Sequence, residues 1–428
     1  MISKNRVLES LCSEHGRQMA EVEDLSIDTI QAGLEAGSMV MLANPNHDGV
    51  RPVLIGQPAK IKVNANLGTS PFLNDFDLEV NKAITAHQAG AHTVMDLSTG
   101  GDLESIRKQI LKATPLPLGT VPLYSVAQKY IQNGEDPGHM DAEELFVEIA
   151  QQAKQGVDFM TLHCGVTAEA AAMARQEDRS LGIVSRGGSI LARWMEVNSR
   201  ENPLLEDYDR LLDICLAHNV TISLGDGLRP GAGADAGDRA QWEEVIVLAG
   251  LAKRARQAGV QVMIEGPGHV PLHLVQSQIQ GMKRLCDQAP LYVLGPLPTD
   301  IAPGYDHIAG AIGGALAGMA GLIEIAGIQE RLRPDFSPGY GFTAIVIALL
   351  GRGNAFKVVL AALFFGLLLV GGTSLEVAYT VPSALVEIIQ ALVILFLITA
   401  EFFKSYRVGI DIERGPTETP ARPQRGDD

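Results

Sequence analysis

Seven apolar runs between residues 62 and 271 each end in a polar, glycine-flanked tip, and we predict that each run is a buried β-strand. The runs are 62–68, 93–101, 118–124, 159–165, 182–188, 221–231 and 261–271. Between them, segments such as 141–156, 204–219 and 242–259 repeat apolar residues at three- and four-residue spacing, which predicts amphipathic helices. Alternating strands and helices predict a parallel sheet. The single-domain size and the missing G-x-G-x-x-G opening favour a (β/α)8 TIM-like barrel of the α/β class.

The pattern changes beyond about residue 318, where long apolar runs replace the polar strand tips. The run 383–403 has about the 20 residues that a membrane-spanning helix needs, whereas 355–372 is slightly shorter and 341–351 is shorter still. Helices of a soluble core are the alternative interpretation, and the lack of a polar stripe over 356–370 argues against it. We therefore predict an α-helical, transmembrane segment after the barrel.

These patterns divide the chain into four parts. They are an N-terminal region of helices and loops (1–60), the barrel (61–318), the hydrophobic helices (319–405) and a disordered tail (406–428) that is rich in proline and charge. The basic residues Lys404, Arg407 and Arg414 follow the last apolar run and predict a cytoplasmic tail. Because the N-terminus is charged and has no apolar segment, we expect no signal peptide and a cytoplasmic barrel. Because of the apolar runs, we expect this barrel to be tethered to the inner membrane through 341–403.

Charge and cysteine content narrow the class of protein. The formal net charge is −16 and the isoelectric point is about 5.1, which argues against a nucleic-acid partner. Mean hydropathy is +0.12, high for a soluble enzyme, and the excess lies toward the C-terminus. The four cysteines contain no C-x-x-C pair, and reduced thiols in a cytosolic protein are the simplest interpretation.

Polar side chains and glycines gather where the predicted strands end. They are Asn66, Asp96, Ser98, Tyr124, His163, Ser185, Arg186, Gly187, Asp226, Gly227, Arg229, Glu265, His269, Tyr292 and Asp300. Arginines beside glycine-rich turns suit a phosphate, because guanidinium is a rigid donor fork and glycine lets backbone N–H groups approach. Asn66, Asp226 and Glu265 suit ribose hydroxyls or ring nitrogens. Each segment alone also fits an ordinary turn, so the prediction of a binding site depends on their shared position at strand ends.

His269, in the segment EGPGHVP, is a candidate metal ligand near Glu265. Zinc requires about three or four ligands, so one histidine does not define a site. His307, in APGYDH, is a second candidate from its sequence context alone.

Eight ordered segments resemble the phosphomethylpyrimidine synthase family of thiamin biosynthesis and its relative, 5-hydroxybenzimidazole synthase. The segments are VNANLGTS, TVMDLSTGGDLESIR, LGTVPLY, TLHCGVT, IVSRGGS, SLGDGLRPG, MIEGPGHVP and LGPLPTDIAPGYDH, and the resemblance extends from about residue 1 to 318. It implies a homodimeric lyase of the radical S-adenosylmethionine type on a (β/α)8 barrel. Such an enzyme converts 5-aminoimidazole ribonucleotide to hydroxymethylpyrimidine phosphate with S-adenosylmethionine, a [4Fe–4S] cluster and zinc.

By motif, the resemblance assigns a set of substrate-binding positions. They are Asn66, Met95, Tyr124, His163, Ser185, Arg186, Gly187, Asp226, Gly227, Leu228, Arg229, Glu265 and Tyr292, and His269 matches one of two zinc-binding histidines. The chain departs from the family further on. Arg333 stands near the position of the second histidine, and no cysteine follows Cys286, whereas the family has a C-x-x-C-x4-C motif there. We therefore expect missing cluster ligands, an incomplete zinc site and impaired catalysis.

The segment from about 319 to 410 resembles the C-terminal part of a sugar or nucleoside ABC-transporter permease. The hypothesis is an apparent fusion, joined in the glycine- and alanine-rich sequence GGALAGMAGLIE. Three functions follow: a synthase, of the thiamin or the benzimidazole branch; a permease fragment with a barrel attached; or a barrel that binds a nucleotide without catalysis. The barrel covers most of the chain and has the more specific motifs, so the first hypothesis is favoured.

Overall fold

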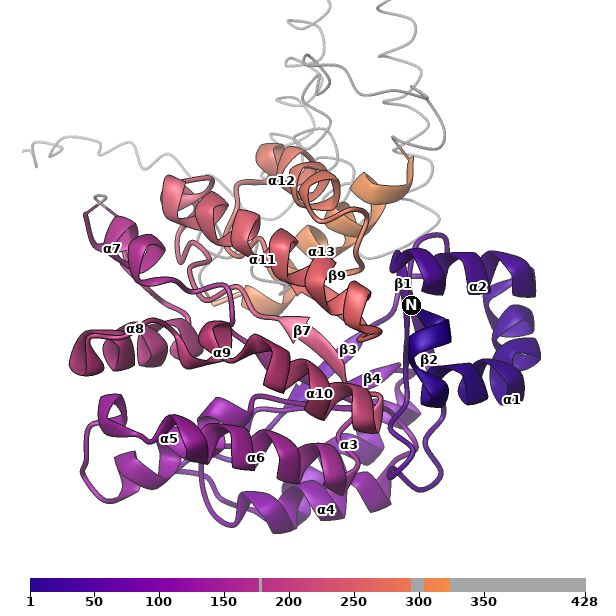
Figure 1. Ribbon diagram of the computed structural model, residues 1–428, viewed down its shortest axis with the longest axis horizontal. Coiled ribbons are helices and arrows are strands. Elements are labelled where there is room, and N and C mark those ends of the chain that lie inside the picture. Colours follow the sequence, from indigo (N-terminus) through magenta and orange to yellow (C-terminus); the bar gives the residue numbers. More distant parts are fainter. Residues whose placement is uncertain (177–178, 294–303, 324–428) are drawn as a thin grey trace, which may run out of the picture. The chain divides into compact units, whose positions relative to one another are not determined.

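Seven parallel strands form the central sheet of the computed structural model, which describes residues 1–176, 179–293 and 304–323 (Figure 1). The strands follow one another in chain order: β3 (Asn64–Leu67), β4 (Thr93–Asp96), β5 (Leu118–Thr120), β6 (Phe159–Leu162), β7 (Thr221–Leu224), β8 (Val262–Glu265) and β9 (Leu291–Tyr292). β4, β6, β7 and β8 are buried along their whole length, as expected of strands covered on both faces. The α/β class and the parallel sheet are confirmed.

The sheet curls until its two edge strands approach each other. β3 and β9 stand at opposite ends of the strand order, yet the hydroxyl of Tyr292 on β9 lies 2.7 Å from Nδ2 of Asn64 on β3. Among the described residues no backbone pairing joins these two strands. The observed sheet is therefore a curled half-barrel, and the eighth strand and full closure stay a prediction.

Helices follow the strands and cover the outer face of the sheet (Figure 1). They are α3 (Phe76–Gln88), α4 (Leu103–Ala113), α5 (Pro122–Gln132), α6 (Ala142–Gln155), α7 (Ala168–Gln176), α8 (Arg186–Asn198), α9 (Pro203–Glu206), α10 (Tyr208–His218), α11 (Arg239–Ala258), α12 (Leu272–Leu285) and α13 (Asp306–Ile323). Side-chain caps begin several of them; Asp141 caps α6 and Asp238 caps α11 by accepting backbone N–H groups. The helices predicted over 141–156, 204–219 and 242–259 are confirmed, the second as α9 and α10.

The segment 182–188 is not a strand, and this prediction was wrong. Ser185 instead caps α8, because its hydroxyl accepts the N–H of Gly188 at 3.2 Å. Two glycines follow, and a side chain would collide with the His163 ring at Gly187 and with the Gly227 backbone at Gly188. The apolar part of the run is short, and the backbone amides that a strand would pair are used to begin a helix. Arg186 consequently lies at a helix start rather than a strand end.

The N-terminal region contains the predicted helices, α1 (Arg6–Glu23) and α2 (Ile27–Ala36), and the predicted turn around Pro45. It also contains an antiparallel hairpin, β1 (Met39–Leu42) and β2 (Val53–Gly56), that the sequence analysis missed. The hairpin packs against the amino ends of the barrel strands: the N–H of Met41 donates to Gln261 at 2.7 Å. This region therefore covers the end of the sheet opposite to the predicted binding site.

α13 continues through residue 318, the predicted end of the barrel, as far as Ile323. Within residues 1–176, 179–293 and 304–323, no helix is both long enough and apolar enough to span a bilayer. The predicted spans 341–351, 355–372 and 383–403 lie outside the described residues, as does the tail.

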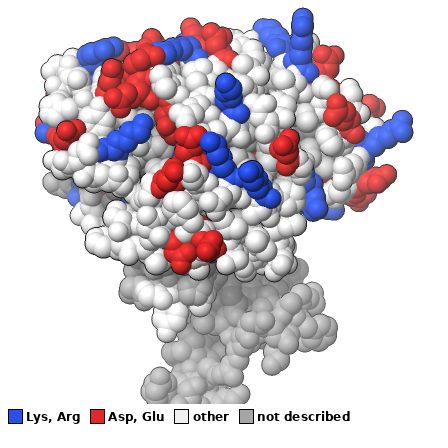
Figure 2. All heavy atoms as spheres, turned by 90° about the horizontal axis from the view of Figure 1, so that it is seen from below, with Lys and Arg blue, Asp and Glu red and all other residues white. Residues whose placement is uncertain are grey.

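Acidic and basic side chains are interspersed over the described surface that faces the viewer in Figure 2. On that face of the described residues, no broad single-sign area stands out. A nucleic-acid backbone is usually held by a continuous basic surface. The mixed charge on this face gives no support to such a partner.

Candidate functional site

Three of the thirteen predicted substrate-binding residues, Ser185–Gly187, begin α8, which follows α7 rather than a strand. The other ten lie on or just after a strand, or in the first turn of the helix that follows one. Because the strands are parallel, these positions share the carboxyl edge of the sheet. Asn66, Met95, Glu265 and Tyr292 lie in β3, β4, β8 and β9; His163 and Asp226–Arg229 follow β6 and β7; Tyr124 lies in the first turn of α5; and Ser185–Gly187 begin α8. Asp300 lies outside the described residues.

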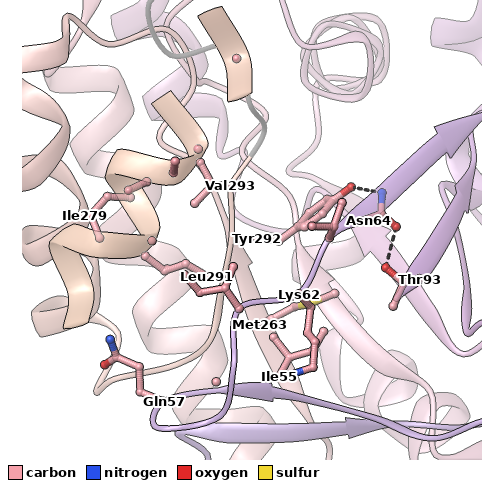
Figure 3. A pocket seen from close by; sticks show the side chains of 18 of the residues that line it. Ile55, Gln57, Lys62, Asn64, Thr93, Met263, Ile279, Leu291, Tyr292 and Val293 are labelled. Atoms are coloured by element: carbon pink, nitrogen blue, oxygen red, sulfur yellow. Dashed lines mark hydrogen bonds between the residues drawn. The ribbon is translucent and has the colours of Figure 1, made fainter. Parts of the chain in front are cut away.

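The hydroxyl of Tyr292 joins three strands at this edge. It lies 2.7 Å from Nδ2 of Asn64, 3.5 Å from Oδ1 of Asn66 and 3.6 Å from Sδ of Met95. Asn64 also donates to Oδ1 of Asn66 at 2.8 Å. Its own Oδ1 accepts the hydroxyl of Thr93 at 2.8 Å, and Figure 3 shows this bond beside the one to Tyr292. Asn64 was not predicted. Its position two residues before Asn66, on the same face of a strand, is the sequence signal that identifies it.

A buried group of charges occupies the middle of the site. Nη1 of Arg229 donates to Oδ1 of Asp226 at 2.9 Å. Burial, reinforced by the nearby Asp226 charge, raises the pKa of Glu265 to about 7. The other oxygen of Asp226, Oδ2, is buried and has no hydrogen-bond partner among the described residues. An unsatisfied buried carboxylate oxygen suits a ligand that brings N–H or O–H donors.

Two hydroxyl groups hold the Glu265 carboxylate. Thr161 on β6 and Ser223 on β7 each donate to Oε1 at 2.6 Å. The two residues face each other in the strand register, so the sheet itself brings their hydroxyls together. Neither was predicted, although each is a small polar residue within an apolar strand.

His163 lies between two glycine backbones. A Cβ atom built on Gly187 would lie 2.2 Å from its ring, and one built on Gly225 would lie 2.9 Å away, so only glycine permits this packing. Burial and the neighbouring Arg229 charge lower the pKa of His163 to about 3, which keeps the ring neutral. Its Nδ1 atom is buried without a partner among the described residues.

The start of α8 brings a second cation to the site. The guanidinium of Arg186 lies 5.2 Å from the ring centre of Tyr124, a cation–π distance, and the side chain is exposed. Gly188 packs directly against the loop after β7, because a Cβ there would lie 2.0 Å from the carbonyl oxygen of Gly227. The loops that bear Arg186 and Arg229 are therefore in backbone contact. Arginine at a helix start is a suitable arrangement for an anion.

A cavity of about 1430 Å³ opens beside these residues. Asn64, Asn66, Arg229, His269 and Tyr292 contribute to its lining, and much of the remainder comes from residues 55–63 and from apolar side chains of β8, β9 and α13. Figure 3 shows Ile55, Gln57 and Lys62 on one side of the cavity and Leu291 and Tyr292 of β9 on the other. Ligand pockets typically measure about 300–1,000 Å³, so the space is sufficient for a ribonucleotide.

The described residues do not fit an iron–sulfur cluster. All four cysteines of the chain are described, and they lie on separate elements: Cys12 in α1, Cys164 after β6, Cys215 in α10 and Cys286 at the end of α12. Burial raises the pKa of each thiol, to about 11 for Cys12 and about 12 for Cys215 and Cys286, whereas cluster ligands are thiolates.

A zinc site is likewise not assembled in the part of the chain that the structure describes. No three His, Cys, Asp or Glu side chains gather there in a manner that would hold a metal ion. His269 follows β8, lines the cavity, and donates its backbone N–H to Pro230 at 3.1 Å. His307 lies in α13, and Arg333 lies outside the described residues.

Comparison with known proteins supports the resemblance. The model of the radical SAM ThiC family matches residues 5–326. A second model, described as a branched-chain amino acid transport system or permease component, matches residues 304–398. The two matches overlap in the region of α13. The predicted resemblance to the phosphomethylpyrimidine synthase family is thus confirmed. The C-terminal part matches a permease model as predicted, whereas the sugar or nucleoside class stays a prediction.

Individual relatives agree with the family match. A phosphomethylpyrimidine synthase of Syntrophus aciditrophicus is 50% identical over 321 residues, which cover 75% of this chain and 74% of the relative. The phosphomethylpyrimidine synthase of Methanocaldococcus jannaschii is 50% identical over 311 residues, 73% of each chain. That of Moorella thermoacetica is 51% identical over 304 residues, 71% of this chain and 70% of the relative.

Proposed function

We propose that this chain, which belongs to the radical SAM ThiC family, binds 5-aminoimidazole ribonucleotide at the carboxyl edge of its parallel sheet. This is the substrate expected for a synthase that makes hydroxymethylpyrimidine phosphate in thiamin biosynthesis. The observation that carries the proposal is the convergence of Arg229, Asp226 and Glu265 on one buried group beside a large cavity.

The chemistry of the site matches the parts of such a ligand. Arg186, at the start of α8, and Arg229 supply cations for a phosphate. The carboxylates of Asp226 and Glu265 accept hydrogen bonds from ribose hydroxyls or from the amino group of the imidazole. Neutral His163 and the Tyr292 hydroxyl provide further hydrogen-bonding groups at the ring. In this proposal the chain's own residues bind and orient the substrate and exclude water from it.

We further propose that the chain does not complete the reaction unaided. The family's radical chemistry requires a cluster that reduces S-adenosylmethionine, and the four cysteines present lie on different elements and are held as thiols. The proposed function of this chain is therefore ribonucleotide binding by a ThiC-type barrel with impaired catalysis. Zinc binding through His269 would need ligands beyond those that the described residues supply.

Titration calorimetry of the full chain with 5-aminoimidazole ribonucleotide tests the binding step. We expect stoichiometric binding that weakens about 10- to 150-fold in Arg229→Ala, because a charge-assisted hydrogen bond contributes about 1.5–3 kcal/mol. Arg17→Ala is the matched control, since Arg17 is exposed on α1 at the far end of the sheet. Unchanged affinity in Arg229→Ala would remove this residue from the site, and no binding by the unmodified chain would refute the proposal.

Iron and sulfide analysis after anaerobic reconstitution tests the impairment. We expect far fewer iron and sulfide ions than the four of each per chain that a [4Fe–4S] cluster holds. Finding about four of each would show that the cluster forms after all.

We interpret the permease-like match as a membrane-associated segment that the chain has in addition to its ribonucleotide-binding barrel. We propose that the chain joins a cytoplasmic ThiC-type barrel to an apolar segment, 341–403, that associates with the inner membrane. Homodimerisation is the family expectation. Membrane fractionation of cells that express the full chain, compared with a variant shortened after residue 336, tests the tether.

A further inference from the structure

The loop Asp226–Arg229 is held by two side chains that do not themselves belong to the predicted site. Glu244 of α11 accepts the backbone N–H of Gly227 at 2.8 Å and that of Leu228 at 2.7 Å, one with each carboxylate oxygen. Arg179 donates from Nη2 to the carbonyl oxygen of Leu228 at 2.8 Å. The peptide units on both sides of Leu228 are thus held by two polar side chains, Glu244 on the N–H side and Arg179 on the carbonyl side.

Both side chains are buried, and they are linked to each other through α11. Glu244 is 1% exposed and the side chain of Arg179 is 2% exposed. Arg179 makes a two-pronged ion pair with Asp238, with Nη2 2.7 Å from Oδ1 and Nε bonded to Oδ2. Asp238 caps α11, the helix that carries Glu244. A closed ring therefore runs from α11 through Arg179 and Leu228 and back to α11; we name it the Glu244–Arg179 clamp.

The clamp fixes the position of the backbone from which the Arg229 side chain extends. Arg229 directly follows Leu228, and its guanidinium is already oriented by the carboxylate and carbonyl oxygens of Asp226, at 2.9 and 3.2 Å. Gly227 in turn packs against Gly188 near the start of α8. Movement of the loop would therefore shift Arg229 and separate it from the α8 turn that carries Arg186.

Polar side chains at the positions of Glu244 and Arg179 are not needed to fill the core. An apolar residue would fill the same space, and burying ionised groups is costly unless their hydrogen bonds are satisfied. Here the bonds go to three backbone groups of one ligand-facing loop, to the helix cap Asp238 and to the carbonyl oxygen of Gly182. The cost of burial is consistent with selection for one loop conformation rather than for stability alone.

We propose that Glu244 and Arg179 are positioning residues that hold the Asp226–Arg229 loop in its ligand-binding conformation without touching the ligand. The inference rests on the proposed function for the identity of the ligand, a ribonucleotide. The conformation of the loop itself is independent of that identity and can be measured in the ligand-free chain.

Amide hydrogen exchange combined with ligand titration tests the clamp on the full chain. In Glu244→Gln the amide oxygen accepts one N–H, but the NH2 group faces the other donor. We expect exchange at Gly227 and Leu228 to accelerate about tenfold or more, and affinity for 5-aminoimidazole ribonucleotide to fall about tenfold. Glu243→Gln, one residue away on α11 and without a bond to the loop, should change neither.

Arg179→Gln provides the discriminating arm. Arg179 contacts only the carbonyl side of Leu228, so faster exchange of the Gly227 and Leu228 N–H groups in this variant would show that the loop is held as a unit. Arg179→Lys keeps the charge and one hydrogen bond, and it should restore part of the affinity. Arg175→Gln is the matched control, because Arg175 lies on α7 and bonds to Glu196 and the Ala192 carbonyl instead.

Two outcomes would overturn the inference. Exchange at Gly227 and Leu228 that stays unchanged in Glu244→Gln would show that the carboxylate does not hold the loop. Faster exchange throughout the barrel, with a matching fall in the urea midpoint, would show that Glu244 and Arg179 contribute only to the general stability of the barrel. If the unmodified chain fails to bind the ribonucleotide, the proposed function is refuted, and the exchange data still decide whether the clamp holds the loop.

Discussion

Replacing Glu265 with glutamine should make the stability of the barrel less sensitive to pH. Burial and the nearby Asp226 charge raise the pKa of this carboxyl from an ordinary 4.5 to about 7. Between these values the folded chain keeps a proton that the unfolded chain releases, so the unmodified barrel loses stability as pH rises from about 4.5 to about 7. Glutamine has no such proton, and its amide oxygen still accepts the hydroxyls of Thr161 and Ser223.

The magnitude follows from the size of the shift. At about 1.36 kcal/mol for each pKa unit, the rise corresponds to an upper bound of about 3–4 kcal/mol. Asp226 is also buried, and burial raises its pKa as well. Removing the Glu265 charge relieves Asp226 of part of the charge repulsion between the two carboxylates. We therefore expect the unfolding free energy of the variant, relative to that of the unmodified chain, to rise by about 1–3 kcal/mol between pH 4.5 and pH 8.

Tryptophan fluorescence during urea unfolding measures this difference. The chain has two tryptophans, Trp194 in α8 and Trp242 in α11, so the signal reports on the barrel whatever the C-terminal segment does. Unfolding free energies at several pH values between 4.5 and 8.5 are compared for the unmodified chain, Glu265→Gln and the exposed control Glu21→Gln. A difference between the unmodified chain and Glu265→Gln that stays constant over this range would refute the argument.

Two further substitutions test the contacts that shape the barrel. Gly188→Ala places a Cβ 2.0 Å from the Gly227 carbonyl oxygen, so ligand affinity measured by calorimetry should fall about tenfold or more. Gly250→Ala, where a Cβ meets nothing within 4 Å, is the control and should be neutral or slightly stabilising. Equal ligand affinities of Gly188→Ala and the unmodified chain would contradict the importance of the loop contact. Asp158→Ala removes the acceptor of His47 Nδ1 at 2.8 Å and of two backbone N–H groups at 2.7 Å. The free energy of unfolding, measured with urea, should fall by about 3–5 kcal/mol. A fall of less than about 1 kcal/mol would mean that the His47–Asp158 pair does not stabilise the barrel.

Periodicity and turn chemistry were sufficient to predict much of the fold. Alternating strands and helices are a local pattern, because each strand must be apolar on both faces and each helix on one. The positions of His163, Asp226 and Glu265 followed from strand ends, since parallel strands bring those ends to one edge. The same local reasoning failed at 182–188, where a short apolar run preceded a capping serine and two glycines. The later residues, not the apolar ones, decided the conformation.

Contacts between distant residues were beyond that reasoning. Asn64 is 228 residues from Tyr292, and nothing in either segment indicates that one hydroxyl will join the two edges of the sheet. Glu244 lies in the second turn of an ordinary amphipathic helix, and only its approach to Gly227 and Leu228 distinguishes it from Glu243.

The order of the residues alone determined the strand–helix alternation, the family and the side chains available at the strand ends, because these depend on patterns within a few neighbouring positions. The tertiary structure decided how far the sheet curls and which hydroxyl groups donate to Glu265. It also decided which buried side chains hold the Asp226–Arg229 loop. Those outcomes depend on distances between residues that are far apart in the chain. Folding brings such residues together through packing over the whole domain rather than through any local rule.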